Sequence, residues 1–188
     1  MTPASTDVAI LRAAAALIAE RGYHGASMRD IARAVGLQMA SLYHHFGSKQ
    51  ELLVLVMREA MHDLTSCVES AVEAAGADPG DRLAAAIRAH VRFHTERRPE
   101  VIVADAELRA LERPGRAEIV ALRDRHQRLF RGPIEELGVA DAGVIASAVV
   151  TMCTDVALWF RDGGGLDADG VADAFVALVF DGIGRRGD

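Results

Sequence analysis

Hydrophobic residues recur every three or four positions along nearly the whole chain, the spacing that places them on one face of an α-helix. The first such stripe includes Ile10, Ala14 and Ile18 and stops at Gly22, a residue suited to a left-handed helix end. No run alternates strictly between apolar and polar residues, which is the pattern of a half-buried strand. The pattern therefore predicts an all-α fold of about nine helices.

Glycines and prolines divide the rest of the chain. Residues 76–80, Gly-Ala-Asp-Pro-Gly, form the clearest break, and Pro99 and Pro114 mark two more, because the residue before a proline is disfavoured in a helix. The helices expected after residue 80 cover about residues 81–97, 101–111, 116–137, 141–162 and 169–184.

Composition favours a folded chain that works in the cytoplasm. Of 188 residues, 51% are hydrophobic, which is enough for a packed core. Cys67 and Cys153 lie far apart without a CxxC pair, so the sequence indicates neither a disulfide framework nor a zinc site of four ligands. No secretory signal is evident, and the apolar stretch at residues 142–154, which is free of Asp, Glu, Lys and Arg, is shorter than the roughly 20 residues of a membrane helix.

Charge is distributed unevenly. The whole chain carries a net charge of −6, but residues 1–50 contain five Lys or Arg and three Asp or Glu, a net of +2. Residues 51–188 therefore carry −8. An acidic average can hide a local cationic surface, so a nucleic-acid partner is best sought in the first quarter of the chain.

Residues 27–46 have the pattern of a helix-turn-helix. Ser27 followed by Asp30 is a capping-box signal with Asp in place of Glu, and predicts the start of a short helix. Gly36 permits the positive φ of a tight turn before a second helix. The apolar positions expected to face the core of this motif are Ile31, Val35, Leu37, Leu42 and Phe46.

The second helix of this motif predicts a DNA-reading surface. A recognition helix places its N-terminal residues on base edges, where the Gln38 amide can pair with adenine and the two residues after it can touch a thymine methyl. Tyr43 and His44, one turn later, suit phosphates, as does Lys49 beside the next helix start. The residues expected to contact DNA are Ser27, Arg29, Gln38, Met39, Ala40, Ser41, Tyr43, His44 and Lys49.

Residues 5–55 resemble the N-terminal domain of TetR-type transcriptional regulators. The resemblance is carried by Glu20-Arg21-Gly22-Tyr23, Ser41-Leu42-Tyr43-His44-His45-Phe46 and Lys49-Gln50-Glu51-Leu52-Leu53. It implies a two-fold dimer that represses transcription from a palindromic DNA operator and is released by a small molecule. We expect a helix-turn-helix domain over residues 1–50 and a ligand-binding and dimerisation domain over residues 51–188, with no cofactor.

The last two predicted helices carry apolar stripes wider than one small domain needs to cover. Pairing with a second copy in a four-helix bundle would cover them, and a dimer also suits two successive major grooves. Core helices of a monomer are the alternative explanation. The residues expected at the dimer interface are Val149, Cys153, Val156, Phe175, Leu178 and Val179.

A ligand pocket is expected among the middle helices. Its candidate lining residues are Phe93, Ile102, Leu122, His126, Phe130, Met152 and Trp159. His90 and His94 have the spacing of a metal pair, with Asp105 or Glu107 as third ligand, so a metal sensor is an alternative. The sequence leaves open whether Arg161 faces a ligand, a partner subunit or water.

Two stretches of the second domain point to a ligand class. Residues 158–166, Leu-Trp-Phe-Arg-Asp-Gly-Gly-Gly-Leu, together with residues 105–109, Asp-Ala-Glu-Leu-Arg, resemble the sensor domain of TetR-type repressors of lipid and steroid catabolism that respond to acyl-CoA thioesters. No GxSxG, HExxH, P-loop or dinucleotide fingerprint is present, so we do not expect an enzyme. A DNA-binding protein without an effector is the remaining alternative.

Overall fold

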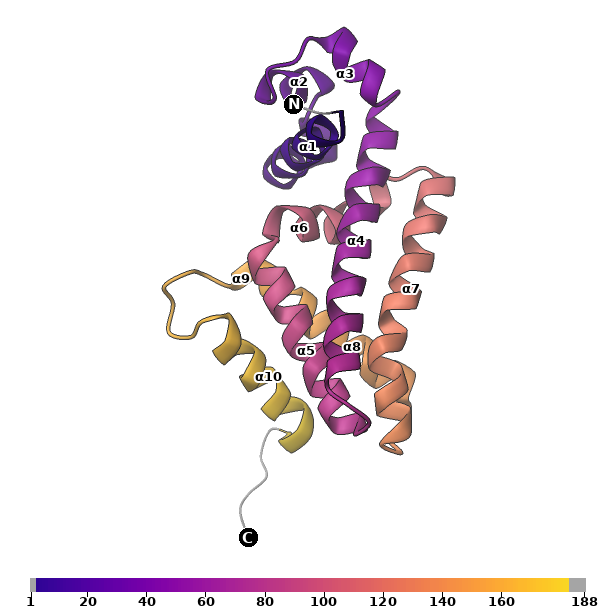
Figure 1. Cartoon of the computed structure of the whole chain (residues 1–188), viewed down its shortest axis with the longest axis vertical. Helices are drawn as coiled ribbons and strands as arrows, with labels where there is room; N and C mark the ends of the chain where they lie inside the picture. The colour runs from indigo at the N-terminus through magenta and orange to yellow at the C-terminus, as the bar shows by residue number, and fades with distance from the viewer. Residues whose placement is uncertain (1–2, 183–188) are drawn as a thin grey trace. The chain divides into compact units, whose positions relative to one another are not determined.

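The computed structural model describes the backbone of residues 3–182 and the side chains of residues 6–182 (Figure 1). These residues contain no strand, which confirms the all-α prediction. The helices are α1 (Pro3–Gly25), α2 (Met28–Ala34), α3 (Met39–His45), α4 (Lys49–Ala74), α5 (Pro79–Glu96), α6 (Arg98–Ala106), the 3₁₀ turn η1 (Glu107–Ala110), α7 (Arg113–Glu136), α8 (Ala142–Thr154), α9 (Val156–Trp159) and α10 (Ala168–Asp181).

The prolines begin helices where the sequence predicted breaks. Pro99 and Pro114 are each the second residue of a helix, where the missing N–H of proline would have no helical partner, so α6 and α7 start three residues earlier than expected. The predicted helix 101–111 ends as η1, and the predicted helix 141–162 is divided by Asp155 into α8 and α9. The expected end of the last helix, Gly184, lies outside the described residues.

The chain forms two compact units. Within the described residues, unit 1 comprises residues 3–62 and 99–122, and unit 2 comprises residues 63–98 and 123–182. The division into domains after residue 50 stays a prediction. In unit 1, α1, α2 and α3 gather beside the first turns of α4 (Figure 1). The apolar core of unit 1 includes Ile10, Ile18, Ile31, Leu42, Leu52, Leu53, Met57, Val103 and Ile119, all fully or almost fully buried.

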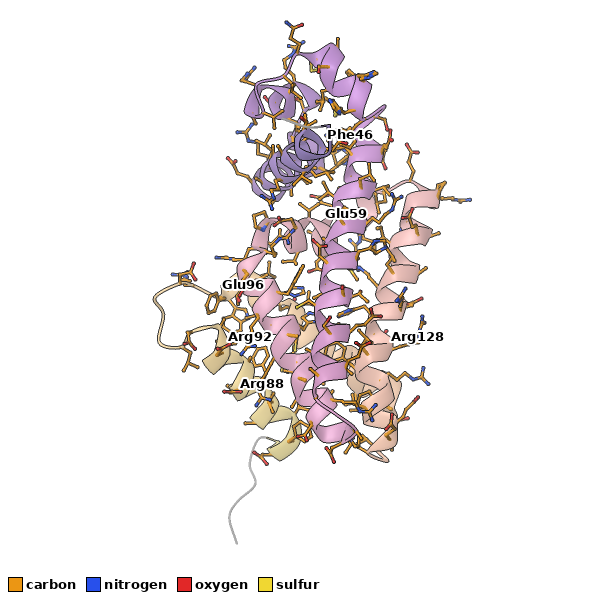
Figure 2. All side chains as sticks on the ribbon, viewed as in Figure 1. Phe46, Glu59, Arg88, Arg92, Glu96 and Arg128 are labelled. Atoms are coloured by element: carbon orange, nitrogen blue, oxygen red, sulfur yellow. The ribbon has the colours of Figure 1, made fainter. Side chains whose placement is uncertain are left out.

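Helix α5 is the centre of unit 2 and packs against α8, α9 and α10. Two ion pairs hold α10 along α5: Arg88 Nε lies 2.7 Å from Asp173 Oδ1, and Arg92 Nε lies 2.5 Å from Asp169 Oδ1 (Figure 2). The two arginines are one helical turn apart, as are the two aspartates, so the pairs join the two helices at successive turns.

Candidate nucleic-acid interface

The start of α2 is fixed by the predicted capping box. The backbone N–H of Asp30 donates to Ser27 Oγ at 3.2 Å, and the N–H of Ser27 donates to Asp30 Oδ2 at 3.3 Å. The hydrogen bond from Ser27 lowers the pKa of the Asp30 carboxyl, which stays ionised at the positive end of the helix. Ile31 is buried, and Gly36 has the expected positive φ of 70°. The sequence prediction of this turn is confirmed.

Helix α3 is anchored on one face and open on the other. Leu42 is fully buried and Phe46 is 5% exposed, as predicted. Gln38 is the N-cap residue of α3, but its side chain makes no hydrogen bond to the helix end, so the amide is not used in capping. Of the other predicted contact residues on α3, Ala40, Tyr43 and His44 are exposed, whereas Ser41 is half-buried and Met39 packs on the unit 1 core.

The cations predicted to meet phosphates differ in their surroundings. Arg29 is exposed and has no ion pair among the described residues. Lys49 is half-buried: its Nζ donates to the carbonyl oxygen of Tyr23 and lies 4.1 Å from the centre of the Tyr23 ring. Burial lowers the pKa of Lys49, partly offset by Glu107. The Lys49 ammonium has three donors and uses one on Tyr23, and its role in phosphate binding stays a prediction.

Side chains also cap the start of α4. The N–H of Glu51 donates to Ser48 Oγ at 3.0 Å, and the Glu51 carboxylate accepts the N–H of Gly47 at 2.9 Å. Both ends of the Gly47–Glu51 segment are thereby fixed.

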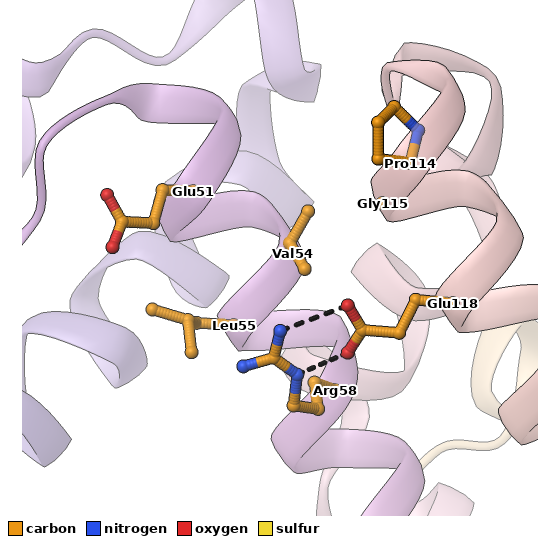
Figure 3. Close-up of a pocket in the computed structure, with 7 residues that line it drawn as sticks. All are labelled: Glu51, Val54, Leu55, Arg58, Pro114, Gly115 and Glu118. Atoms are coloured by element: carbon orange, nitrogen blue, oxygen red, sulfur yellow. Dashed lines mark hydrogen bonds and ion pairs between the residues drawn. The ribbon is translucent and has the colours of Figure 1, made fainter.

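A pocket of about 280 Å³ lies between α4 and the first turns of α7, within unit 1 (Figure 3). Arg58 and Glu118 form a two-pronged ion pair at its side, with Arg58 Nη2 3.0 Å from Glu118 Oε2. A Cβ atom at Gly115 would lie 2.5 Å from Val54, so α7 approaches α4 at a residue without a side chain. Sequence reasoning missed this site because its two walls are about 60 residues apart and share no local pattern.

The predicted ligand-lining residues divide between the units. Phe93, His126 and Phe130 are buried in unit 2, where Met152 is half-buried. Ile102 and Leu122 belong to unit 1, and both are half-buried.

A shallow groove of about 520 Å³ runs along α10 in unit 2. Trp159, which is 50% exposed, lines it together with Arg161 and Phe175. The Arg161 side chain is exposed at the border of this groove, so in the single chain it faces water.

Three histidines form a buried chain of hydrogen bonds in unit 2. His90 Nδ1 lies 3.0 Å from His126 Nε2, His90 Nε2 lies 3.1 Å from Thr154 Oγ1, and His94 stacks on His90 at 4.1 Å. His126 Nδ1 lies 3.4 Å from Thr65 Oγ1. Burial lowers the pKa of His94 and of His126 to about 4 each, and lowers that of His90 as well.

This arrangement differs from the metal pair considered from the sequence. Both ring nitrogens of His90 already face protein partners, and the Glu107 carboxylate accepts the N–H of Tyr23 in unit 1 at 2.9 Å. Among the side chains described, no group of three or more His, Cys, Asp or Glu has the arrangement of a metal site.

The residues predicted at the dimer interface fall into two classes. Val149, Cys153 and Val156 are at most 6% exposed and belong to the core of unit 2. Phe175 and Val179 on α10 are half-buried, and Leu178 is 36% exposed. On α8 the exposed apolar residues are instead Val144 and Ile145. The predicted residues of α8 are thus buried within unit 2, and their place in a dimer interface stays a prediction.

The stretch Ala142–Trp159 is the one part of the described chain with the length and composition of a membrane span, and a third of it is buried. Helices in protein interiors pass the same test of length and composition. The stretch is also divided at Asp155 into α8 and α9, so it is not one continuous helix.

Comparisons with known proteins match both parts of the chain. Residues 10–56 match the family described as bacterial regulatory proteins, tetR family, and residues 76–183 match the tetracyclin repressor-like C-terminal domain. The second match covers more than half of the chain. The chain belongs to the TetR family. It is a regulator and not an enzyme, as its family and its relatives show.

The relatives of this TetR-family chain include transcriptional repressors. It is 30% identical to the HTH-type transcriptional repressor KstR2 of Rhodococcus jostii, over 93% of this chain and 89% of that one. It is 29% identical to KstR2 of Mycolicibacterium smegmatis, over 96% of this chain and 92% of that one.

Solved structures of the family share the fold over nearly the full length. The crystal structure of AibR in complex with isovaleryl coenzyme A and operator DNA is 32% identical, with a TM-score of 0.86, and covers 93% of this chain and 98% of that one. The regulator PfmR from Thermus thermophilus is 36% identical, with a TM-score of 0.84, and covers 94% of this chain and 99% of that one.

Proposed function

We propose that this TetR-family protein is a dimeric transcriptional repressor that acts in the cytoplasm and leaves a palindromic operator when an acyl-CoA or another largely apolar metabolite binds it. The observation that carries DNA binding is the open face formed by α2 and α3. There Arg29, Gln38, Tyr43 and His44 are exposed, while the opposite face is anchored by the buried Leu42. This division leaves the groups that can read bases and bind phosphates free to face the major groove of DNA, while the protein core stays apolar.

Two lines support the effector class. The buried polar side chains of unit 2 are histidines and threonines, and no described Asp, Glu, Lys or Arg is buried. An interior of this kind suits an apolar acyl chain with an uncharged polar group, and would keep the charged phosphates of a coenzyme outside. The related AibR is solved with isovaleryl coenzyme A.

The first experiment selects bound duplexes from a random library with the purified protein. We expect a palindromic consensus whose half-sites lie about one helical turn, ~34 Å, apart. Absence of enrichment at low salt, with no small molecule found in the denatured protein by mass spectrometry, would contradict DNA binding.

The second experiment tests the effector on the selected duplex. Isothermal titration calorimetry with acetyl-, isovaleryl- and octanoyl-CoA is expected to show binding of at least one thioester, and that thioester is expected to release the duplex. Free coenzyme A and the corresponding free acids are the controls. No heat with any acyl-CoA would overturn the ligand class while leaving DNA binding intact.

A further inference from the structure

Gln50, in the first turn of α4, joins three segments of unit 1 through one side-chain amide. Its Nε2 donates to Tyr23 Oη at 2.9 Å and to the carbonyl oxygen of Ala110 at 2.7 Å, and its Oε1 accepts the backbone N–H of Glu112 at 3.2 Å. A carbonyl oxygen only accepts and a peptide N–H only donates, so these two partners fix the orientation of the amide. Both amide hydrogens and the amide oxygen are committed to these contacts.

Tyr23 is held at its backbone as well as at its hydroxyl. Gly22 has φ 71° and ψ 163°, a conformation that suits glycine, and this break in α1 turns the Tyr23 N–H towards Glu107. That N–H donates to Glu107 Oε1 at 2.9 Å, and the Tyr23 carbonyl accepts from Lys49. We call Tyr23, Gln50, Glu107, Ala110 and Glu112 the latch.

The latch connects two kinds of segment. Tyr23 lies four residues before Ser27, and Gln50 follows Lys49, so both flank residues proposed to contact DNA. On its other side, residues 107–112 connect α6 to α7, and α7 continues along the chain into unit 2. No member of the latch belongs to the proposed DNA-contact set.

We propose that Gln50 is a positioning residue for operator binding, whose amide holds α1 and α4 in the DNA-binding arrangement only while residues 107–112 are docked. Undocking of this segment then releases the DNA without any change in the contact residues themselves. The inference rests on the proposed function, because it concerns the same DNA-binding surface.

Thermodynamic reciprocity gives the inference a measurable consequence. If docking of residues 107–112 favours DNA binding, DNA binding must stabilise the docked segment by the same factor. The salt dependence of affinity separates positioning from contact, because its slope counts the phosphates that are neutralised. A positioning residue changes the affinity and leaves the slope unchanged.

The test compares two variants of the full-length protein on the duplex selected by the wild type. Gln50→Glu keeps the shape and removes both donated hydrogen bonds, and Gln50→Met removes the hydrogen bonds without adding charge. Each is expected to weaken binding by at least about tenfold with an unchanged salt slope. The matched control is Gln127→Glu on α7, which makes the same change at an amide bonded to Ser147, and is expected to bind like the wild type.

Hydrogen exchange supplies a readout that needs no variant. In the wild type, DNA is expected to slow the exchange of the backbone N–H groups of Tyr23 and Glu112. Unchanged exchange at both N–H groups would overturn the inference. If the Gln50 variants lose their helical circular dichroism signal, their DNA affinities cannot be compared, and the exchange measurement on the wild type decides the question.

Two further outcomes would also overturn it. Weak binding by Gln50→Glu with normal binding by Gln50→Met would assign the loss to charge repulsion, and a salt slope reduced by about one in Gln50→Met would make Gln50 a DNA contact. If the wild type enriches no duplex, the proposed function is contradicted, and this inference, which rests on it, is contradicted as well. Equal binding by wild type and both variants contradicts the latch alone.

Discussion

Unit 1 and unit 2 differ in whether their polar side chains are buried or exposed. All five buried polar side chains in the described chain, Thr65, His90, His94, Thr95 and His126, belong to unit 2. Unit 2 also carries nine of the twelve exposed large hydrophobic side chains, whereas the polar groups of the unit 1 helix-turn-helix face water. The contrast supports the proposed functions: a surface that reads DNA presents hydrogen-bonding groups outside, and exposed apolar side chains on unit 2 suit the proposed contact with a second copy.

The largest expected effect follows from the buried histidines. In the folded chain the pKa of His94 and of His126 is about 4, against an unfolded value near 6.5, because burial disfavours the charged form. Between these values the unfolded chain binds more protons than the folded chain. The contribution of the neutral histidines to the free energy of unfolding is therefore fully present above pH 6.5 and is lost as the pH drops towards 4. The loss is on the order of 1 kcal/mol per pH unit for each histidine.

Urea unfolding at fixed protein concentration between pH 7 and pH 5 measures this loss. His126→Gln is expected to make the pH dependence shallower, and His62→Gln, at an exposed position, is expected to leave it unchanged. If the free energy of unfolding depends on pH equally in His126→Gln and the wild type, burial of His126 in unit 2 does not cause the pH dependence.

The second prediction concerns the exposed apolar surface of unit 2. Leu178→Glu places a charge on the exposed face of α10, and we expect it to dissociate the dimer. Because a dimer binds two half-sites at once, the affinity for the selected duplex should fall by at least about 100-fold. Light scattering gives the mass in solution, and Leu137→Glu, at an exposed position just after α7, is the matched control. A variant that stays dimeric would exclude this face of α10 from the interface.

Local signals made the helix-turn-helix predictable from the sequence. The capping box of Ser27 and Asp30 spans three residues, and Gly36 requires its positive φ whatever surrounds it. Pro99 and Pro114 mark breaks between helices, as the sequence predicted, but the next helix begins one residue before each proline and not two residues after it, because proline is tolerated in the first turn of a helix.

Contacts between distant residues could not be predicted in this way. Tyr23 and Glu107 are separated by 84 positions, and Arg58 and Glu118 by 60. The i, i+4 spacing of His90 and His94 is visible in the sequence and suggests a metal pair, but the contact of His90 with His126 depends on how α7 packs against α5. The spacing of apolar residues identifies which face of a helix is buried, but it does not identify the helix that packs against that face.

The third prediction tests whether the cationic groups of unit 1 differ in function from those of unit 2. Arg29→Ala is expected to weaken DNA binding several-fold at moderate salt and to reduce the salt slope by about one, the amount for one lost phosphate contact. Arg128→Ala removes an exposed arginine of unit 2 (Figure 2) and is expected to change neither. Equal slopes for Arg29→Ala and the wild type would exclude Arg29 from the phosphate contacts.

The smallest expected change in affinity, and the most specific one, concerns Gln38. Its amide is exposed and makes no hydrogen bond to the end of α3, so it is available to pair with a base edge. An amide that pairs in this way contributes about 1–3 kcal/mol of discrimination against the wrong base. Repeating the library selection with Gln38→Ala should therefore relax the consensus at one position of each half-site and leave the others sharp. Gln127→Ala, an amide truncation in unit 2, should reproduce the wild-type consensus, and an unrelaxed consensus for Gln38→Ala would remove Gln38 from the readout.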